Sequence, residues 1–433
     1  MGGSDLKVKH AKLKAPAESD WRRIFLEAVR SRTSDIHIEP QDDALVVRFR
    51  QAGQLTTALS LAIESSKPLT RQLKSKAKLD LKQTKAPQAG SFSEVYDHHI
   101  YDLSLDTMPL VSGERLVIHI HDPSAQPLEL KALGLWGNGL THVQNSLATS
   151  HGLILVSGPN HSGVSTSLAS CALALSSPLH QAVASVEDKT AYRLPGVDYL
   201  SVNPSSGMTW VRALKRQLKL AQVVVLGNMP DGETAETAVK AAHAQQLILG
   251  GVRADNTLAA LMQLLRLSGH PAELAVSLRL AWNQRLIPRL CPDCRQVYTP
   301  DVALQNLLSQ KFHLDSSSNL TRLQQLETEA ISQFGSDLSP AVSKPSTTST
   351  GITMLWKAKT GGCTNCHHSG YAGATALFEI VANSDKLRDR LAASSSITDI
   401  NMALVASRIT SLAVDGLVKA LCGLIEIEGV LGL

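Results

Sequence analysis

Residues 153–168, LILVSGPNHSGVSTSL, decide the fold of this chain. A short apolar run, a glycine-bounded loop and a helix-forming run follow one another in this stretch. That order is typical of a phosphate-binding loop, G-x-x-x-x-G-K-[ST], whose backbone N–H groups surround phosphate. Gly158 and Gly163 have the spacing of its two glycines, and Ser165 stands at its magnesium-binding hydroxyl. Val164, however, occupies the position of the lysine.

An ordinary βα turn with two glycines is the alternative, and the loop alone leaves both interpretations open. If the loop binds nucleotide, the candidate ligands are its own residues and the first helical turn: Gly158, Pro159, Asn160, His161, Ser162, Gly163, Val164, Ser165 and Thr166. A charge-assisted hydrogen bond is worth about 1.5–3 kcal/mol. Without the lysine we therefore expect ATP and Mg²⁺ to bind weakly, through the remaining backbone N–H groups.

Length and composition exclude several classes of protein. A chain of 433 residues predicts two or three domains. No apolar run is long enough to span a membrane, and the polar, basic start lacks a signal core, so we expect a cytoplasmic protein. The net charge of +4 is modest and aromatic residues make up only 4%, which argues against a nucleic-acid partner.

Four of the six cysteines form two C-x-x-C pairs, Cys291 with Cys294 and Cys363 with Cys366. In a cytosolic chain, two such pairs indicate a structural four-cysteine Zn²⁺ site rather than disulfides. Free thiols are the less favoured alternative. The remaining two, Cys171 and Cys422, lie in apolar runs and are expected in the core.

The first part of the chain predicts a small α+β domain. We expect disorder over residues 1–16 and a domain over 17–122. Its expected elements are an amphipathic helix from Trp21, a lysine-rich helix over 66–81, and strands over 34–40, 45–50 (ended by Gly53), 101–105 and 115–120. Residues 123–138 have no such pattern and are interpreted as a linker.

Residues 139–433 predict an α/β domain. Apolar strands are expected over 153–156, 182–188, 223–227 and 247–252, with a helix over 211–220 between them, so the sheet should be mostly parallel with helices on both faces. Residues 301–351, between the cysteine pairs, are polar and predict an insertion with a helix or two over 305–331. A strand over 376–380 opens a largely helical C-terminal region, 376–433.

Several motifs together resemble the secretion ATPase family of type II secretion and type IV pilus assembly. The residues that carry the resemblance are Ser34-Asp35-Ile36-His37-Ile38-Glu39-Pro40, the run Gly152–Pro159, Val186-Glu187-Asp188, Gly227 with Asp231, Glu233, Thr234, Ala235 and Glu236, Gln284-Arg285-Leu286 with Arg289-Leu290-Cys291-Pro292, and Gly362-Cys363 with Cys366 and Gly370-Tyr371. The resemblance extends over nearly the whole chain from Trp21.

This resemblance implies a PAS-like domain over 17–122 and a RecA-like P-loop motor domain over 139–433 that contains a zinc module, 285–375. It also implies a hexamer, docked on inner-membrane pilus or secretion platform proteins, and therefore peripheral to the inner membrane. The family directs arginines equivalent to Arg48 and Arg50 toward nucleotide. Its acidic box corresponds to Glu187, a candidate group for acting on water or magnesium.

The departures from the family fall on its chemistry. Besides Val164, Asn228 replaces the catalytic glutamate, Pro230 replaces an arginine, and Arg253 replaces a histidine. Asparagine holds a water molecule but cannot take its proton. In the first domain, Ser104 and His119 replace two further arginines of the family.

Three functions remain open on the sequence. The first is a degenerate member that binds nucleotide weakly without hydrolysing it, as a structural or regulatory subunit in a homo-hexamer or a ring mixed with an active paralogue. The second is an active ATPase with rearranged catalytic residues. The third and least favoured is a RecA-like nucleic-acid motor. Val164 and Asn228 discriminate the first two, and salt-dependent DNA binding would indicate the third.

Overall fold

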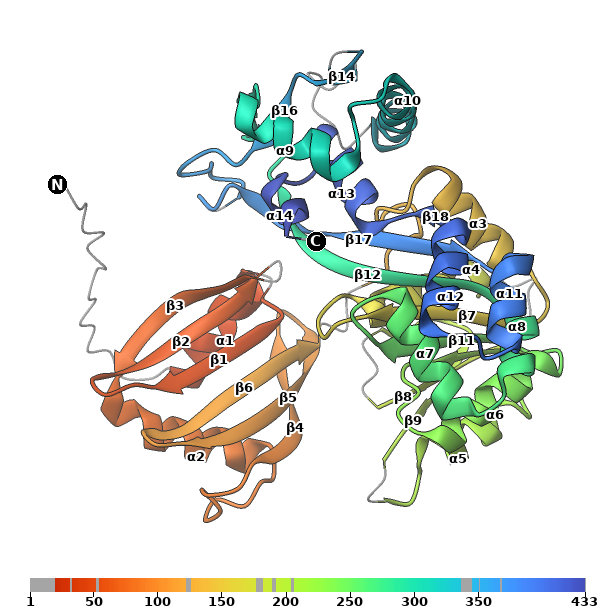
Figure 1. Cartoon of the computed structure of the whole chain (residues 1–433). Helices are drawn as coiled ribbons and strands as arrows, with labels where there is room; N and C mark the ends of the chain where they lie inside the picture. Colours follow the sequence, from red (N-terminus) through yellow and green to blue (C-terminus); the bar gives the residue numbers. More distant parts are fainter. Residues whose placement is uncertain are drawn as a thin grey trace. The chain divides into compact units, whose positions relative to one another are not determined.

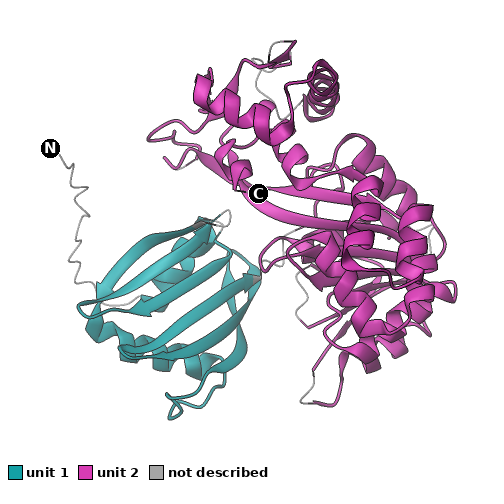
Figure 2. Cartoon of the chain, in the orientation of Figure 1, with its two compact units in different colours: residues 1–122 teal, residues 123–433 magenta. Residues whose placement is uncertain are grey.

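The chain divides into two compact units, residues 1–122 and 123–433 (Figure 2). The computed structural model describes residues 20–31, 33–51, 54–121, 126–176, 182–188, 192–203, 206–335, 345–349, 351–366 and 368–432. The expected disorder of residues 1–16 and the strand end at Gly53 lie outside the described residues.

Unit 1 is an antiparallel sheet with two helices on one face (Figure 1). Its strands lie in the order β3-β2-β1-β6-β5-β4. The bounds are α1 Asp20–Arg30, β1 Asp35–Pro40, β2 Ala44–Gln51, β3 Gln54–Ala62, a 3-10 turn η1 Ile63–Ser65, α2 Ser66–Lys76, β4 Gln88–Tyr96, β5 His99–Leu110 and β6 Gly113–His121. Both helices pack on alternate, inward-facing strand residues, so the α+β expectation for this part is met.

Two details of unit 1 differ from expectation. The helix expected over 66–81 ends at Lys76, because Lys78 adopts a left-handed conformation with φ of 56°. The strands β3 and β4 were not expected. They are the edge strands of the sheet, where polar and small residues replace the apolar alternation that marks the inner strands.

Unit 2 is built on an eight-stranded sheet in the order β18-β17-β12-β7-β11-β10-β8-β9. The six strands from β12 to β9 are parallel, whereas β17 and β18 are antiparallel to their neighbours. The bounds are β7 Gly152–Gly158, β8 Val183–Glu187, β9 Val197–Ser201, β10 Val223–Leu226, β11 Leu247–Arg253, β12 Leu278–Leu290, β17 Tyr371–Ala382 and β18 Arg408–Thr410. The mostly parallel sheet is confirmed; β9, β12 and β18 were not expected.

Helices cover both faces of this sheet (Figure 1). One face carries α3 Gly137–Leu147 and α4 Val164–Leu175. The opposite face carries α5 Trp210–Gln217, α6 Gly232–His243, α7 Thr257–Ser268, α8 Pro271–Ser277, α11 Asp385–Ala392 and α12 Ile397–Ser407. The two faces bury the alternate side chains of the same strands, so each strand between them is apolar throughout.

The whole segment between the cysteine pairs, which includes the expected insertion 301–351, folds onto the C-terminal helices and shares one core with them. Its elements are β13 Gln296–Tyr298, α9 Val302–Phe312, α10 Ser317–Phe334, β14 Thr347–Thr348, β15 Gly351–Ile352 and β16 Leu355–Lys357, and the C-terminal helices are α13 Leu412–Leu421 and α14 Glu428–Leu431. The carboxylate of Glu327, fully buried, accepts the backbone N–H groups of Ser346 and Thr347. The segment is therefore an integral part of unit 2.

Two expected boundaries need correction. The described part of the expected linker, residues 126–138, is packed on unit 2, because Leu130, Leu133, Leu135 and Trp136 are buried there and α3 already begins at Gly137. The C-terminal region 376–433 is helical only in part, since β18 and most of β17 belong to the main sheet.

Candidate functional site

The loop after β7 has the backbone of a phosphate cradle. It connects Gly158, the last residue of β7, to Val164, the first residue of α4. Gly163 caps the helix at φ of 86°, a conformation that strains any other residue. A Cβ on Gly158 would lie 2.6 Å from the backbone carbonyl oxygen of Gln284, so this position also requires glycine. The two glycines are thus explained by the loop geometry itself.

The side chain of Gln284, on the neighbouring strand β12, holds this loop through hydrogen bonds. Its Nε2 donates to the Ser162 carbonyl at 2.8 Å. Its Oε1 accepts from the Ser167 hydroxyl at 2.8 Å and from the Trp282 indole at 3.0 Å. Sequence reasoning quoted Gln284 only within a motif and missed this role. Nothing in the sequence signals it, because the contact depends on β12 lying beside β7.

The cradle lacks a positive charge on its own helix. Val164 is half-buried and packs against the core cluster between α4 and the sheet. Ser165 is exposed in the first turn, and the Thr166 hydroxyl lies 3.1 Å from the Tyr192 hydroxyl. The Ser162 Oγ is buried without a hydrogen-bond partner in the part of the chain that the structure describes. The loop therefore has the backbone shape of a phosphate cradle, the N-terminal end of the α4 dipole and an unpartnered Ser162 hydroxyl. The helix α4 carries no cationic side chain.

The candidate catalytic residues lie at the same edge of the sheet, where the parallel strands end. β8 ends at Glu187, which accepts a hydrogen bond from the Ser185 hydroxyl at 2.6 Å. A Cβ on Gly227 would lie 3.3 Å from the Glu187 Cγ, so Glu187 lies against Gly227, the residue before Asn228. With strands about 4.8 Å apart, β10 lies about 10 Å and β8 about 14 Å from β7 along the sheet.

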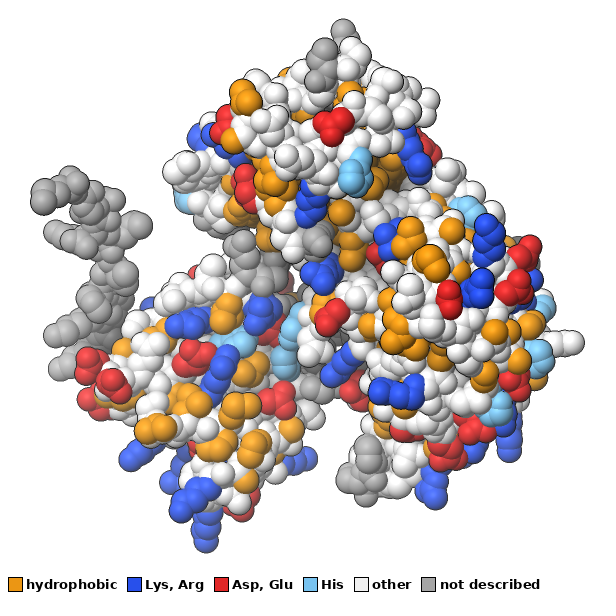
Figure 3. Space-filling view, in the orientation of Figure 1, with side chains coloured by type: hydrophobic (Ala, Val, Ile, Leu, Met, Phe, Trp, Pro, Cys, Tyr) orange, Lys and Arg blue, Asp and Glu red, His pale blue; other side chains and the backbone are white. Residues whose placement is uncertain are grey.

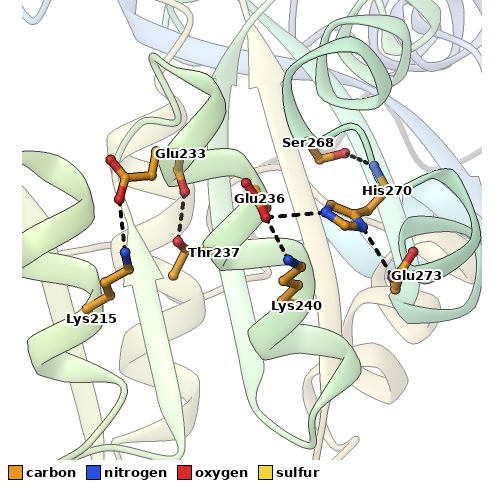
Figure 4. A network of polar contacts seen from close by, with 8 residues as sticks. All are labelled: Lys215, Glu233, Glu236, Thr237, Lys240, Ser268, His270 and Glu273. Atoms are coloured by element: carbon orange, nitrogen blue, oxygen red, sulfur yellow. Dashed lines mark hydrogen bonds and ion pairs between the residues drawn. The ribbon is translucent and has the colours of Figure 1, made fainter.

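The acidic residues that follow Asn228 are engaged in a helix cap and in ion pairs. Asp231 caps α6 by accepting the Thr234 N–H at 2.8 Å. Two further carboxylates form ion pairs on the helix surface (Figure 4): Glu233 with Lys215 at 2.9 Å, and Glu236 with Lys240 at 2.6 Å and His270 at 3.3 Å. The hydrogen bonds from Lys240 and His270 lower the pKa of Glu236, which makes it a weaker base.

In unit 1, both candidate nucleotide-binding arginines are engaged with carboxylates of the same sheet. Arg50 Nε lies 3.2 Å from Asp35, and Arg48 lies 3.4 Å from Glu39. Asp35 also pairs with His119, one of the residues that replace family arginines. The contact of Arg48 and Arg50 with nucleotide stays a prediction.

The four predicted cysteine ligands come together in one cluster. All four Sγ atoms lie within 4.8 Å of one another. Three measured separations are 3.8 Å for Cys291–Cys363, 3.8 Å for Cys294–Cys366 and 3.7 Å for Cys363–Cys366. A regular tetrahedron with Zn–S bonds of about 2.3 Å has edges of about 3.8 Å. The cluster therefore fits a tetrahedral metal ion of the size of Zn²⁺.

Backbone groups around the cluster favour thiolate. The N–H groups of Cys363 and Gly370 donate to the Cys366 Sγ at 3.1 and 3.2 Å. Burial opposes ionisation of Cys366, but these hydrogen bonds outweigh it and lower its pKa to about 6. Burial raises the pKa of Cys294 to about 12, so this thiol is deprotonated only when a cation is bound beside it. The donor set is that of a structural site with no open position.

No helix of the described residues combines the length and hydropathy needed to cross a bilayer.

Comparison with known proteins gives one consistent result. The family described as "Type II/IV secretion system protein" matches residues 10–432. The "Type II secretion system protein E" of Dickeya dadantii is 31% identical over 408 residues, covering 94% of this chain and 73% of that protein. The "Type IV pilus assembly ATPase PilB" of Myxococcus xanthus is 26% identical over 96% of this chain and 68% of that protein.

Solved structures support the fold alone, because their sequence identity to this chain is low. The Legionella pneumophila ATPase DotB superimposes with a TM-score of 0.61 at 14% identity, covering 96% of this chain and 97% of that one. The pilus retraction motor PilT superimposes with a TM-score of 0.54 at 16% identity, covering 94% and 95%.

Proposed function

This chain belongs to the type II/IV secretion system protein family, and we propose that it is a degenerate member of it, which binds nucleotide weakly and does not hydrolyse it. The observation that carries the proposal is the contrast within the phosphate loop. Its glycines and its Gln284 contact are retained, whereas Val164 turns an apolar side chain toward the core where the lysine belongs.

Loss of hydrolysis follows from two missing functions. A lysine in the loop stabilises charge on the transferring phosphoryl group, and loss of one such donor costs about 10²–10³ in rate. At position 228 an amide replaces a carboxylate and cannot accept the proton of the attacking water. The neighbouring carboxylates of α6 are paired or capping, so they do not supply a base.

We propose a structural or regulatory role for this protein in a type IV pilus or type II secretion motor. The printed names of its relatives include a pilus assembly ATPase and a type II secretion protein, which supports this class of machine. A cytoplasmic ring, either a homo-hexamer or a ring shared with an active paralogue and docked on inner-membrane platform proteins, is the assembly we propose. The four cysteines would hold a structural Zn²⁺ that ties both ends of the insertion together.

An active ATPase is the second candidate, and Glu187 is the observation that favours it. This carboxylate is half-exposed at the sheet edge, against Gly227, the residue before Asn228. A nucleic-acid motor has less support. On the face shown in Figure 3, basic and acidic side chains of the described residues are interspersed over each unit, and the net charge is only +4.

Titration of the purified full-length chain with Mg·ADP and with a non-hydrolysable ATP analogue tests the proposal, together with phosphate release and mass by light scattering. We expect weak but saturable binding, background turnover and a ring-sized particle alone or with an active paralogue. Robust hydrolysis that Glu187→Ala abolishes would overturn the proposal in favour of the active ATPase.

A further inference from the structure

Arg253 lies beside the phosphate loop on the neighbouring strand. It is the last residue of β11 and pairs in register with Gly158, where the loop begins. The N–H of Ala254 donates to the Gly158 carbonyl at 3.2 Å, so this pairing holds to the very end of the strand. The side chain of Arg253 is exposed, and within the described part of the chain no carboxylate pairs with it.

The direction of the Arg253 side chain follows from the alternation along β11. A Cβ on Gly251 would lie 3.2 Å from the Leu168 Cδ1, so position 251 faces α4. Val252 packs into the core on the opposite face of the sheet. Because side chains two residues apart share a face, position 253 points to the α4 side at the last residue of the strand. Its partner in register is Gly158, from which the loop leads to the first turn of α4.

The loop itself is prepared for an anion. The N-terminus of α4, a helix of 12 residues, carries partial positive charge and free N–H groups. The Ser162 Oγ is buried at the base of the loop without a partner among the described residues. The missing part is a mobile cation, because Val164 is apolar and half-buried.

We propose that the guanidinium of Arg253 supplies this charge and binds the outer phosphates of a nucleoside di- or triphosphate held in the loop. The inference rests on the proposed nucleotide binding and names the residue on which that binding depends. A guanidinium presents a planar fork of donors that matches phosphate oxygens in pairs. Adjacent strands are about 4.8 Å apart, a span that an arginine side chain bridges from β11 to the loop after β7.

Arg285 is the competing cation at this edge, and its contacts differ. Its guanidinium donates to the Asp255 carbonyl at 3.4 Å, which directs it toward the segment after β11. Arg253 has no such contact among the described residues, so its guanidinium can turn to a ligand without breaking a hydrogen bond within the protein.

Calorimetric titration of the full-length chain with Mg·ADP tests the inference. We expect Arg253→Ala to weaken binding by about tenfold to a hundredfold, the worth of one charge-assisted contact. Arg253→Gln should do the same, and Arg253→Lys should retain part of the affinity. Arg266→Ala removes an equally exposed arginine from the last turn of α7 and is the matched control. Binding of AMP should be unchanged in all four variants, because it lacks the outer phosphates.

The double variant Val164→Lys/Arg253→Ala measures whether the two positions serve the same phosphate. If both side chains serve the same phosphate, Val164→Lys should raise the affinity by a larger factor in the Arg253→Ala background than in the unmodified chain, so the two changes should not be additive. Full affinity in Arg253→Ala and Arg253→Gln would overturn the inference and leave the proposed function standing. Weakened binding in both, together with robust hydrolysis by the unmodified chain, would support the inference and overturn the proposed function. Absence of ADP binding to the unmodified chain would overturn both.

Discussion

The four-cysteine cluster and the phosphate loop are two candidate binding regions of the same unit, and they differ in which of the expected ligand groups are present. The cluster has all its ligands at tetrahedral spacing and backbone donors that favour thiolate. The loop has kept its backbone, its glycines and the Gln284 contact, but its helix has lost the charged side chain. The difference teaches that the geometry of a site and its charge can be lost separately. A structural site fails without all its ligands, whereas a loop keeps its shape without its lysine.

Of the changes that test this comparison, the removal of a cysteine ligand should have the largest effect on the protein. We expect Cys291→Ser to lower the zinc content from about one per chain to near zero, because a closed structural site needs all four thiolates to complete its tetrahedron. The segment between the cysteine pairs should then become sensitive to protease. Atomic absorption and limited proteolysis measure both effects.

The thiol of Cys171 is the control for this prediction, since it lies fully buried in α4 away from the cluster. Cys171→Ala should leave the zinc content unchanged. Acidification of the unmodified protein should release the metal, because protons compete with it for the thiolates. A zinc content that is unchanged in Cys291→Ser would contradict the prediction that the four cysteines bind the metal.

The second prediction disturbs the shape of the loop rather than its charge. Gln284→Leu leaves the Ser162 carbonyl, the Ser167 hydroxyl and the Trp282 indole without their partner. We expect the free energy of unfolding to fall by about 3 kcal/mol, with a parallel loss of nucleotide affinity. Gln324→Leu changes an exposed glutamine of α10 and should stay within about 0.5 kcal/mol of the unmodified protein. Urea denaturation compares the two; equal stability of both variants would contradict the role of Gln284.

The third prediction restores charge to an intact shape. Val164→Lys should tighten Mg·ADP binding by about tenfold to a hundredfold, because the backbone of the loop is already formed. Val164→Met adds length without charge and should leave the affinity near that of the unmodified chain. If both variants bind alike, charge is not what the loop lacks.

The smallest effect is expected for Asn228→Glu alone. Lysine and glutamate act as a unit in catalysis, so restoring one of them recovers almost nothing. We expect ATP turnover to remain at background in this variant and to rise slightly in Val164→Lys/Asn228→Glu. A coupled phosphate-release assay measures both. Substantial turnover from the single change would show that the loop still performs its catalytic part without a lysine.

The sequence predicted those parts of the fold whose signal is local. Buried parallel strands such as β7 and β10 form continuous, mainly apolar runs. The spacing of the C-x-x-C pairs by itself indicates a metal site. The edge strands β3, β4, β9 and β18 were missed, because an edge has few apolar neighbours to alternate with. The interior strand β12 was also missed, because polar residues interrupt its sequence LRLAWNQRLIPRL. The segment 126–136 was interpreted as a linker because its leucines lack periodicity, yet they fill the core under α3.

The candidate site was predictable in its residues but not in its connections. The glycines and Val164 can be identified by spacing along the chain, and Asn228 by the family resemblance. The Gln284 contact and the position of Arg253 beside Gly158 join residues about a hundred positions apart through strand order. Strand order is a property of tertiary packing, and no local pattern of a single sequence contains it.

The hydrogen bond from the Trp136 indole to Asp415, 2.5 Å long, has a consequence for biosynthesis. The same carboxylate accepts from the Phe378 N–H and pairs with Lys419 on its own helix, so three distant parts of unit 2 meet at one buried point. β7 likewise gains its neighbour β12 only after residue 278 has been made. On the ribosome, unit 1 can close its own sheet within 122 residues, whereas unit 2 must wait for nearly its whole length. During that interval its apolar strands are exposed, so we expect unit 2 to need more protection from aggregation than unit 1.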